Sequence, residues 1–253
     1  MKFRGLLFFF LLAAIASADA QALTGNVSVD YPNSGNISQE LNFNVLSETY
    51  FQKFSFFAGL KLFRTKSFFP AVGEKIREND NSAGELGVNY NFLTIGRNRF
   101  NLSLSHYFTI DYEKSLHFLY LDEIYDRTNI GVGHNFNDDF SVSALYQKFV
   151  NSYKNSIIFD IEKALVKNKY FRTYIGYEHQ RDIKTSDSYS FEYEGIRYVL
   201  PKGLKNYLDE KNVIFLRTSV AFLNLDAVAR AGFSDSKIYG RYFSFGLDLG
   251  CGF

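Results

Sequence analysis

Hydrophobic and polar residues alternate with a period of two along most of this chain. The final segment shows the pattern most clearly. From Phe243 to Phe253, apolar side chains occupy every second position, and small or polar residues, three of them glycine, stand between them. Because successive side chains of a β-strand point to opposite faces of a sheet, this spacing predicts a strand with one apolar face and one polar face.

The same alternation predicts eleven further strands. They cover residues 25–31, 41–45, 54–62, 85–92, 100–109, 129–136, 140–147, 157–162, 171–178, 214–222 and 227–233. Three long polar excursions interrupt the series after the third, fifth and ninth strands, at residues 66–82, 111–126 and 181–211. The last excursion is predicted to contain an extra hairpin at 189–199 and a short helical turn at 204–208.

Short turns follow the even-numbered strands, and the long connections follow odd-numbered ones. This arrangement is typical of an antiparallel up-and-down transmembrane β-barrel, in which one rim carries short turns and the other carries long loops. The sequence therefore predicts an all-β barrel of about twelve strands. Counts of ten or fourteen stay open because of the 181–211 excursion and the weak pattern at 227–233.

The first twenty residues predict a signal peptide. Lys2 and Arg4 precede an apolar run at residues 6–16, and small residues follow up to Ala20, where cleavage is expected. This run is too short to cross a bilayer as a helix. The expected organisation is a signal peptide at 1–20 and one barrel domain at 21–253.

Composition narrows the classes of partner and chemistry. The chain has 253 residues, of which 28 are Phe and 18 are Tyr, and its net charge is +1. Aromatic residues suit strands and the girdles of membrane barrels. The charges form no basic block that would follow a phosphate backbone, so no nucleic-acid partner is expected. Cys251 is the single cysteine, which excludes an intramolecular disulfide, and neither a metal nor a cofactor is expected.

The C-terminal segment resembles the last strand of bacterial outer-membrane β-barrels, where alternating apolar residues and a terminal aromatic form the insertion signal. The residues that carry this resemblance are Phe243, Phe245, Leu247, Leu249 and Phe253. The resemblance implies export to the outer membrane of a Gram-negative bacterium. It also implies recognition of this strand by the barrel-assembly machinery, and contact of the apolar face with outer-membrane lipid.

The polar faces of the predicted strands would point into the barrel, and they carry charges of both signs. The candidate lumen-facing charged residues are Lys53, Lys61, Glu85, Asp160, Glu162, Arg172, Glu178, Arg217, Arg230 and Asp248. Charges inside a barrel need either water or partners, because an isolated buried ion is very costly. Two interpretations stay open: a wet passage with charged walls, or a paired network that plugs the lumen.

A small porin-like channel for ions or polar solutes is the predicted function. The alternative is a closed barrel with a structural or surface-adhesion role. Catalysis has less support, because Ser105 and His106 are adjacent and an alternating strand would place them on opposite faces. A rim hydrolase would have to use the acidic residues Asp122, Glu123 and Asp126 of the second long excursion.

Overall fold

The computed structural model describes most of the strand regions of the chain. The described residues are 22–31, 37–48, 54–67, 77–111, 126–136, 139–150, 152–168, 170–186, 189–193, 196–200, 208–222, 225–237 and 240–252. Side chains are described for residues 54, 57, 83–109, 126–136, 139–150, 152–168, 170–186, 208–220, 227–237 and 240–247. The predicted signal peptide and Phe253 lie outside the described residues.

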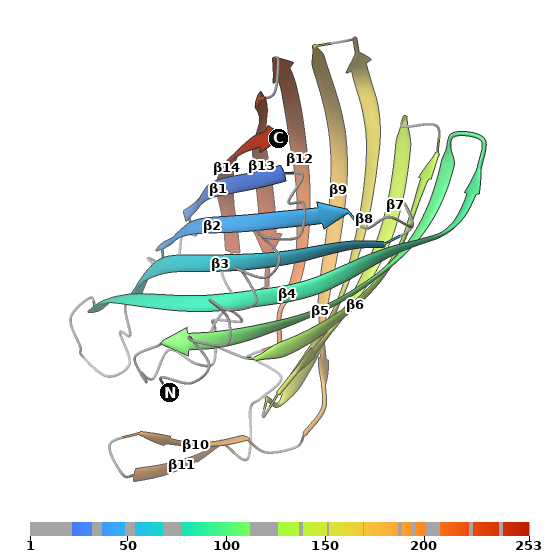
Figure 1. The fold of residues 1–253 in the computed structure, drawn as a ribbon. Coiled ribbons are helices and arrows are strands. Elements are labelled where there is room, and N and C mark those ends of the chain that lie inside the picture. The colour runs from blue at the N-terminus through green and yellow to red at the C-terminus, as the bar shows by residue number, and fades with distance from the viewer. Residues whose placement is uncertain are drawn as a thin grey trace.

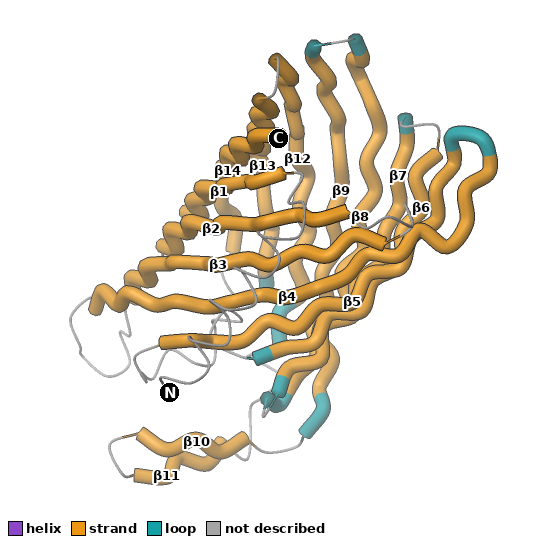
Figure 2. Tube along the Cα trace, viewed as in Figure 1, coloured by secondary structure: helices purple, strands orange, loops and turns teal. Residues whose placement is uncertain are grey.

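The described residues form strands and short connections, with no helix among them (Figure 2). The strands are β1 (Ala22–Tyr31), β2 (Ile37–Glu48), β3 (Phe54–Ser67), β4 (Arg77–Ile95), β5 (Asn98–Asp111), β6 (Arg127–Phe136), β7 (Phe140–Phe149), β8 (Lys154–Lys167), β9 (Phe171–Lys184), β10 (Tyr189–Tyr193), β11 (Ile196–Leu200), β12 (Glu210–Phe222), β13 (Leu225–Ser236) and β14 (Gly240–Gly252). No helix of the described part is long and apolar enough to span a bilayer.

Among the described residues, twelve strands pair in one closed order, β1-β14-β13-β12-β9-β8-β7-β6-β5-β4-β3-β2, and each pairing is antiparallel (Figure 1). The first and last barrel strands pair with each other, with Ala22 opposite Gly252. The predicted all-β, antiparallel up-and-down architecture is confirmed. The hairpin predicted at 189–199 is also present, as the separate two-stranded sheet β10–β11, whereas the helical turn predicted at 204–208 falls almost wholly on residues that are not described.

Connections between the strands differ sharply in length. Residues 96 and 97 alone join β4 to β5, and Gly96 has a φ of +62°, as two-residue hairpin turns require. The long connections follow β3, β5 and β9, as predicted, but the first of them is shorter than expected. β3 continues to Ser67 and β4 begins at Arg77, because backbone pairing continues through a polar stretch that has no apolar alternation.

The outer face of the barrel is apolar. Leu104 on β5, Ile130 on β6, Ile214 on β12 and Phe245 on β14 all expose half or more of their surface. Near the short-turn rim, aromatic rings form a continuous row across β4 to β7, which consists of Phe92, Phe100, His134, Phe136 and Phe140. Such a surface resembles the apolar band and aromatic girdle of a membrane barrel.

On the inner face, aromatic rings lie flat against the wall over glycine residues. A Cβ added to Gly176 on β9 would stand 2.2 Å from the ring of Phe215 on β12, and one added to Gly87 on β4 would stand 2.2 Å from the ring of Phe57 on β3. The missing side chains make room for rings along the sheet. The rings of Phe215 and Phe57 therefore lie against the backbone of the neighbouring strand instead of standing out from the sheet.

Candidate functional site

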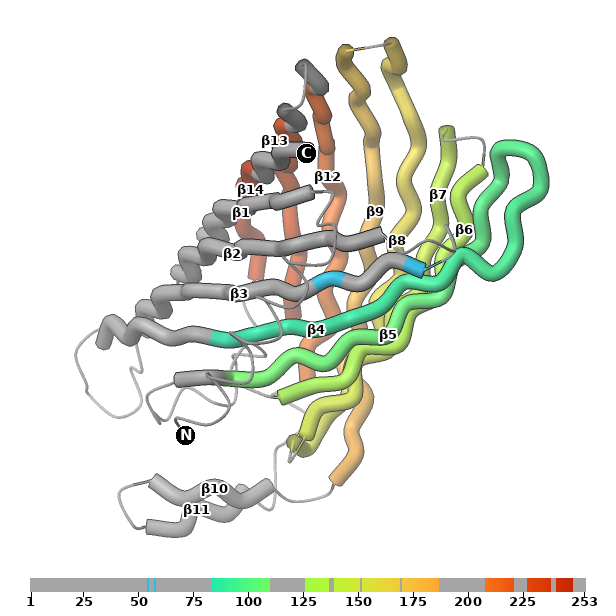
Figure 3. The backbone as a smooth tube through the Cα atoms, in the orientation of Figure 1, coloured from blue at the N-terminus to red at the C-terminus, as the bar shows by residue number. Residues whose placement is uncertain are grey.

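The strands β8, β9, β12 and β13 lie next to one another in the barrel (Figure 3). Their inward side chains carry most of the charged residues of the described inner wall. Inward side chains alternate with outward ones, and the register brings Tyr174 on β9 opposite Arg217 on β12, and Arg217 opposite Arg230 on β13. The antiparallel pairing thus assembles charges that are far apart in the sequence.

Arg217 crosses over β9 to reach Glu162 on β8. Its Nε donates a hydrogen bond of 2.9 Å to Glu162 Oε1, and its Nη2 donates another to Oε2. On the way, the guanidinium lies over the ring of Tyr174, with 4.4 Å from Cζ to the ring centroid. A bidentate hydrogen bond to a carboxylate, together with stacking on an aromatic ring, holds a guanidinium in one orientation.

Arg230 repeats this arrangement one strand further along the sheet. Its guanidinium lies over the ring of Phe215 on β12, 3.8 Å from Cζ to the centroid, and its Nη2 donates a hydrogen bond of 3.0 Å to Glu178 Oε2 on β9. Lys211 on β12 lies 3.8 Å from the other carboxylate oxygen of Glu178. In both cases an arginine passes over an aromatic ring on the intervening strand and binds a carboxylate on the strand beyond.

The interior ion pairs of the described residues follow the wall. Arg217–Glu162 and Arg230–Glu178 join strands two places apart, while Lys211–Glu178 joins direct neighbours. The side chains of these pairs are 14% to 40% exposed, so none of them is fully buried. A network that filled the lumen would instead join opposite sides of the barrel.

Glu85, another predicted lumen residue, belongs to a separate polar row on β4 to β7. Its Oε1 accepts hydrogen bonds from Ser105 Oγ at 2.5 Å and from Asn129 Nδ2 at 3.2 Å. Asn129 in turn accepts a hydrogen bond from Gln147 Nε2 at 3.3 Å. Side-chain hydrogen bonds therefore run along this wall too, from strand to strand.

The other residues predicted to face the lumen differ in their surroundings. Asp160 lies on the inner face opposite Glu178, and it forms no hydrogen bond with the described residues. Arg172 is exposed near the short-turn end of β9, opposite Lys167 and Ser219, and has no ion pair within the described part of the chain. Lys53 lies outside the described residues, and the side chains of Lys61 and Asp248 are not described.

A buried polar network at the long-loop rim was not predicted from the sequence. Lys154 Nζ lies 2.7 Å from Asp182 Oδ2, and the two side chains are 4% and 0% exposed. Asp182 also accepts hydrogen bonds from Ser156 Oγ and from the backbone amide of Asp209, while Ser236 Oγ binds the Asp209 carboxylate. The predicted strands at 157–162 and 171–178 stop short of these residues, because the apolar alternation does not continue to the rim.

The network joins both ends of the longest connection. Asp182 lies near the end of β9 and Asp209 immediately precedes β12, and the Asp182 amide donates a hydrogen bond of 2.9 Å to the Asp209 carbonyl. The β10–β11 hairpin lies between them in the chain. The base of this connection is thereby fixed to the barrel wall.

Ser105 and His106 do not form a catalytic pair, as the alternation predicted. Ser105 is buried on the inner face and binds Glu85, whereas His106 is exposed and lies near Thr128 on the outer face. Asp126 Oδ1 accepts hydrogen bonds from the amide and the hydroxyl of Thr109, both at 2.8 Å, while Asp122 and Glu123 lie outside the described residues. The described part of the chain also contains no cluster of potential metal ligands.

The C-terminal strand presents its aromatic residues outward. Phe243 is 70% exposed and Phe245 is 52% exposed, and the Phe243 ring meets Phe233 of β13 at a centroid distance of 5.2 Å. Leu247 is half-buried. The side chain of Leu249 is not described.

Comparisons with solved structures place the fold among bacterial outer-membrane barrels. An outer membrane channel from Pseudomonas putida F1 is similar over 92% of this chain and 96% of its own, with a TM-score of 0.61 and 11% identity. The translocator domain of the autotransporter NalP from Neisseria meningitidis is similar over 99% of this chain and 96% of its own, with a TM-score of 0.55 and 12% identity. The NanC porin is similar over 90% of this chain and 100% of its own, with a TM-score of 0.53 and 10% identity.

At these identities the likeness concerns the fold alone. The sequence itself matches no family model and no curated protein. The class that the fold defines is the outer-membrane type of antiparallel β-barrel, and the first two neighbours show that this architecture serves both a channel and a translocator domain.

Proposed function

We propose that this protein is an outer-membrane channel of a Gram-negative bacterium that passes small polar solutes. The course of the interior ion pairs carries the proposal: Arg217 and Arg230 bind carboxylates on the same wall and leave the space between the walls unbridged by the described pairs. The apolar outer face and the similarity to channel structures support the same function.

The charge balance of the wall favours weak ion selectivity. Six side chains of β8, β9, β12 and β13 form this layer, three cations and three carboxylates: Lys211, Arg217, Arg230, Asp160, Glu162 and Glu178. Since their formal charges cancel, the layer offers hydrogen-bonding groups without a strong field of one sign. Neutral or weakly charged polar solutes fit such a surface better than polyanions do.

Recording of single-channel conductance tests the proposal directly. The mature protein, refolded and inserted into a planar bilayer, should give discrete conductance steps, with an anion-to-cation permeability ratio near one. Liposomes that carry the protein should swell in solutions of small neutral sugars. Folded, heat-modifiable protein that gives neither steps nor swelling would contradict the channel.

A closed barrel with a role at the cell surface is the second candidate. The fixed base of the longest connection favours it, because Asp182 and Asp209 hold a β-hairpin-bearing segment at the rim, as a surface-binding element would require. The conductance recording separates the two functions, since a closed barrel would not conduct. A non-conducting protein whose 187–207 deletion abolishes adhesion to a surface would support this candidate.

A further inference from the structure

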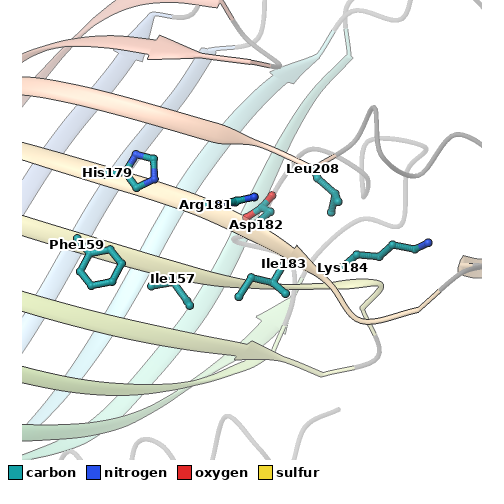
Figure 4. A pocket seen from close by; sticks show the side chains of 8 residues that line it. All are labelled: Ile157, Phe159, His179, Arg181, Asp182, Ile183, Lys184 and Leu208. Carbon is teal, nitrogen blue, oxygen red and sulfur yellow. The ribbon is translucent and has the colours of Figure 1, made fainter.

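A groove of about 490 Å³ lies at the long-loop end of β8 and β9, on their outer side (Figure 4). Its lining combines apolar and charged groups: Ile157 and Phe159 from β8, His179, Arg181, Asp182, Ile183 and Lys184 from β9, and Leu208. Its volume falls within the range of roughly 300–1,000 Å³ that is usual for small-molecule sites. None of these groups belongs to the charged inner layer described above.

Arg181 supplies an exposed cation to the groove. It pairs in register with Ile157 on one side and with Glu210 on the other, yet it forms no ion pair with the described residues. Asp182 is the one carboxylate in the lining, and Lys154, Ser156 and an amide already occupy its oxygens. The groove therefore offers positive charge to an anion.

A hydrogen bond fixes the ring of His179 in this groove. The ring Nδ1 donates to Asn212 Oδ1 at 2.9 Å, and Tyr177 donates its hydroxyl to the same oxygen at 2.7 Å. Because Nδ1 carries the proton of that bond, Nε2 is the ring atom left for a ligand. In this tautomer Nε2 is an acceptor, so it can take a hydrogen bond from a ligand hydroxyl, while Arg181 supplies the donors for an oxyanion.

The groove stands where the outer face changes from apolar to charged. Along β9 the outward residues run Ile175, Tyr177, His179 and Arg181, in steps of about 7 Å. Phe159 is 50% exposed next to His179 and continues the apolar surface toward the middle of the barrel. A ligand that fits both parts has an anionic head and an apolar tail.

We propose that this groove binds a phosphorylated lipid of the outer leaflet, with its phosphate monoester at Arg181, a headgroup hydroxyl at His179 and an acyl chain along Ile157 and Phe159. The inference rests on the outer-membrane location within the proposed function, because the long-loop rim of such barrels faces the cell exterior. The Arg181 guanidinium should bind a doubly charged phosphate monoester more strongly than a singly charged phosphodiester.

Native mass spectrometry of the protein in detergent micelles tests this site, with lipid A as the phosphate-monoester probe and phosphatidylglycerol as the phosphodiester. The wild-type protein should retain lipid A in preference to phosphatidylglycerol. Arg181→Glu should weaken retention of lipid A about tenfold, because it replaces attraction by repulsion. Equal retention of both lipids by the wild-type protein would overturn the proposal.

Arg241→Glu is the matched control. Arg241 is 73% exposed on β14 at the same rim, outside the groove, and lies 3.6 Å from Asp235. Its replacement should leave lipid A retention unchanged, and an equal loss in both variants would overturn the site. If Arg181→Glu does not assemble, Arg181→Gln should weaken retention about threefold, and unchanged retention by that folded variant would overturn the site as well.

The proposed channel and the proposed lipid site can be contradicted independently of each other. A protein that conducts but shows no loss of lipid A on Arg181→Glu would contradict the lipid site alone. A protein that binds lipid A through Arg181 but never conducts would contradict the channel alone.

Discussion

Arg217 on β12 and Glu162 on β8 form a bidentate ion pair that passes over β9, the strand between them. The pair spans 55 positions of sequence. It ties three strands together while it stays on the wall. The fixed charges of the layer are thus held in place along this wall of the barrel.

Removal of Arg217 should change ion selectivity more than folding. In Arg217→Ala the unpaired Glu162 carboxylate leaves net negative charge on the wall, so permeation should shift toward cations, most strongly at low salt, where screening is weak. The loss in unfolding free energy should stay below about 3 kcal/mol, because both groups retain access to water. Reversal potentials across a salt gradient measure the shift.

The double variant Arg217→Ala/Glu162→Ala is the control for this prediction. It removes both charges and should restore the wild-type reversal potential. A large loss of stability in Arg217→Ala, together with a parent protein that does not conduct, would instead favour the closed barrel.

The buried pair Lys154–Asp182 should matter for stability far more than exposed pairs do. Lys154→Met leaves a fully buried carboxylate without its cation, which typically costs about 3–5 kcal/mol. Urea unfolding in lipid vesicles measures this loss. Lys167→Met, at the other end of the same strand, removes the exposed pair with Asp139 and should cost less than about 1 kcal/mol. Equal losses would contradict the buried network.

Gly176 should not tolerate a side chain. Its Cβ would meet the Phe215 ring, which also contacts the Arg230 guanidinium and so has little freedom to move, and Gly176→Ala should cost about 1–3 kcal/mol. At Gly133 the nearest atom is the amide end of the exposed Asn101, which can rotate away, so Gly133→Ala is the matched control. Phe215→Leu should recover part of the loss at Gly176, and unfolding curves that show no such recovery would contradict the predicted clash.

The two faces of β5 should respond differently to charge. Leu104 is 50% exposed on the outer face in the middle of the strand, and Leu104→Arg should cost about 2–4 kcal/mol in a bilayer. Ser103→Arg places the same side chain on the inner face, where the cost should be much smaller. Equal destabilisation of the two variants on unfolding in lipid would show that the outer face does not meet hydrocarbon.

The terminal aromatic should govern assembly. Phe253→Ser removes the last element of the apolar series that includes Phe243 and Phe245. We expect the variant to accumulate in the periplasm as unassembled protein, which cell fractionation and heat-modifiability on gels would reveal. Normal amounts of folded barrel in the outer membrane would exclude this role for the terminal residue.

Strand positions and faces were predictable from the sequence because alternation is a local property. Arg217, Arg230, Glu162 and Glu178 were all assigned to one polar face of the sheet, and the register places them on a common face. The two-residue period alone decides that assignment. The exposed Leu104 and the inward Ser105 follow the same rule.

Only the tertiary structure decided which charges meet. The partner of Arg217 is Glu162, two strands away, although Glu178, Asp160 and Asp248 were equally plausible from the pattern. Lys154 and Asp182 escaped prediction because polar residues near the rim carry no apolar alternation that would mark the strand ends. Both outcomes have one physical reason: a strand's faces depend on its own sequence, whereas its partners depend on the register set by the whole sheet.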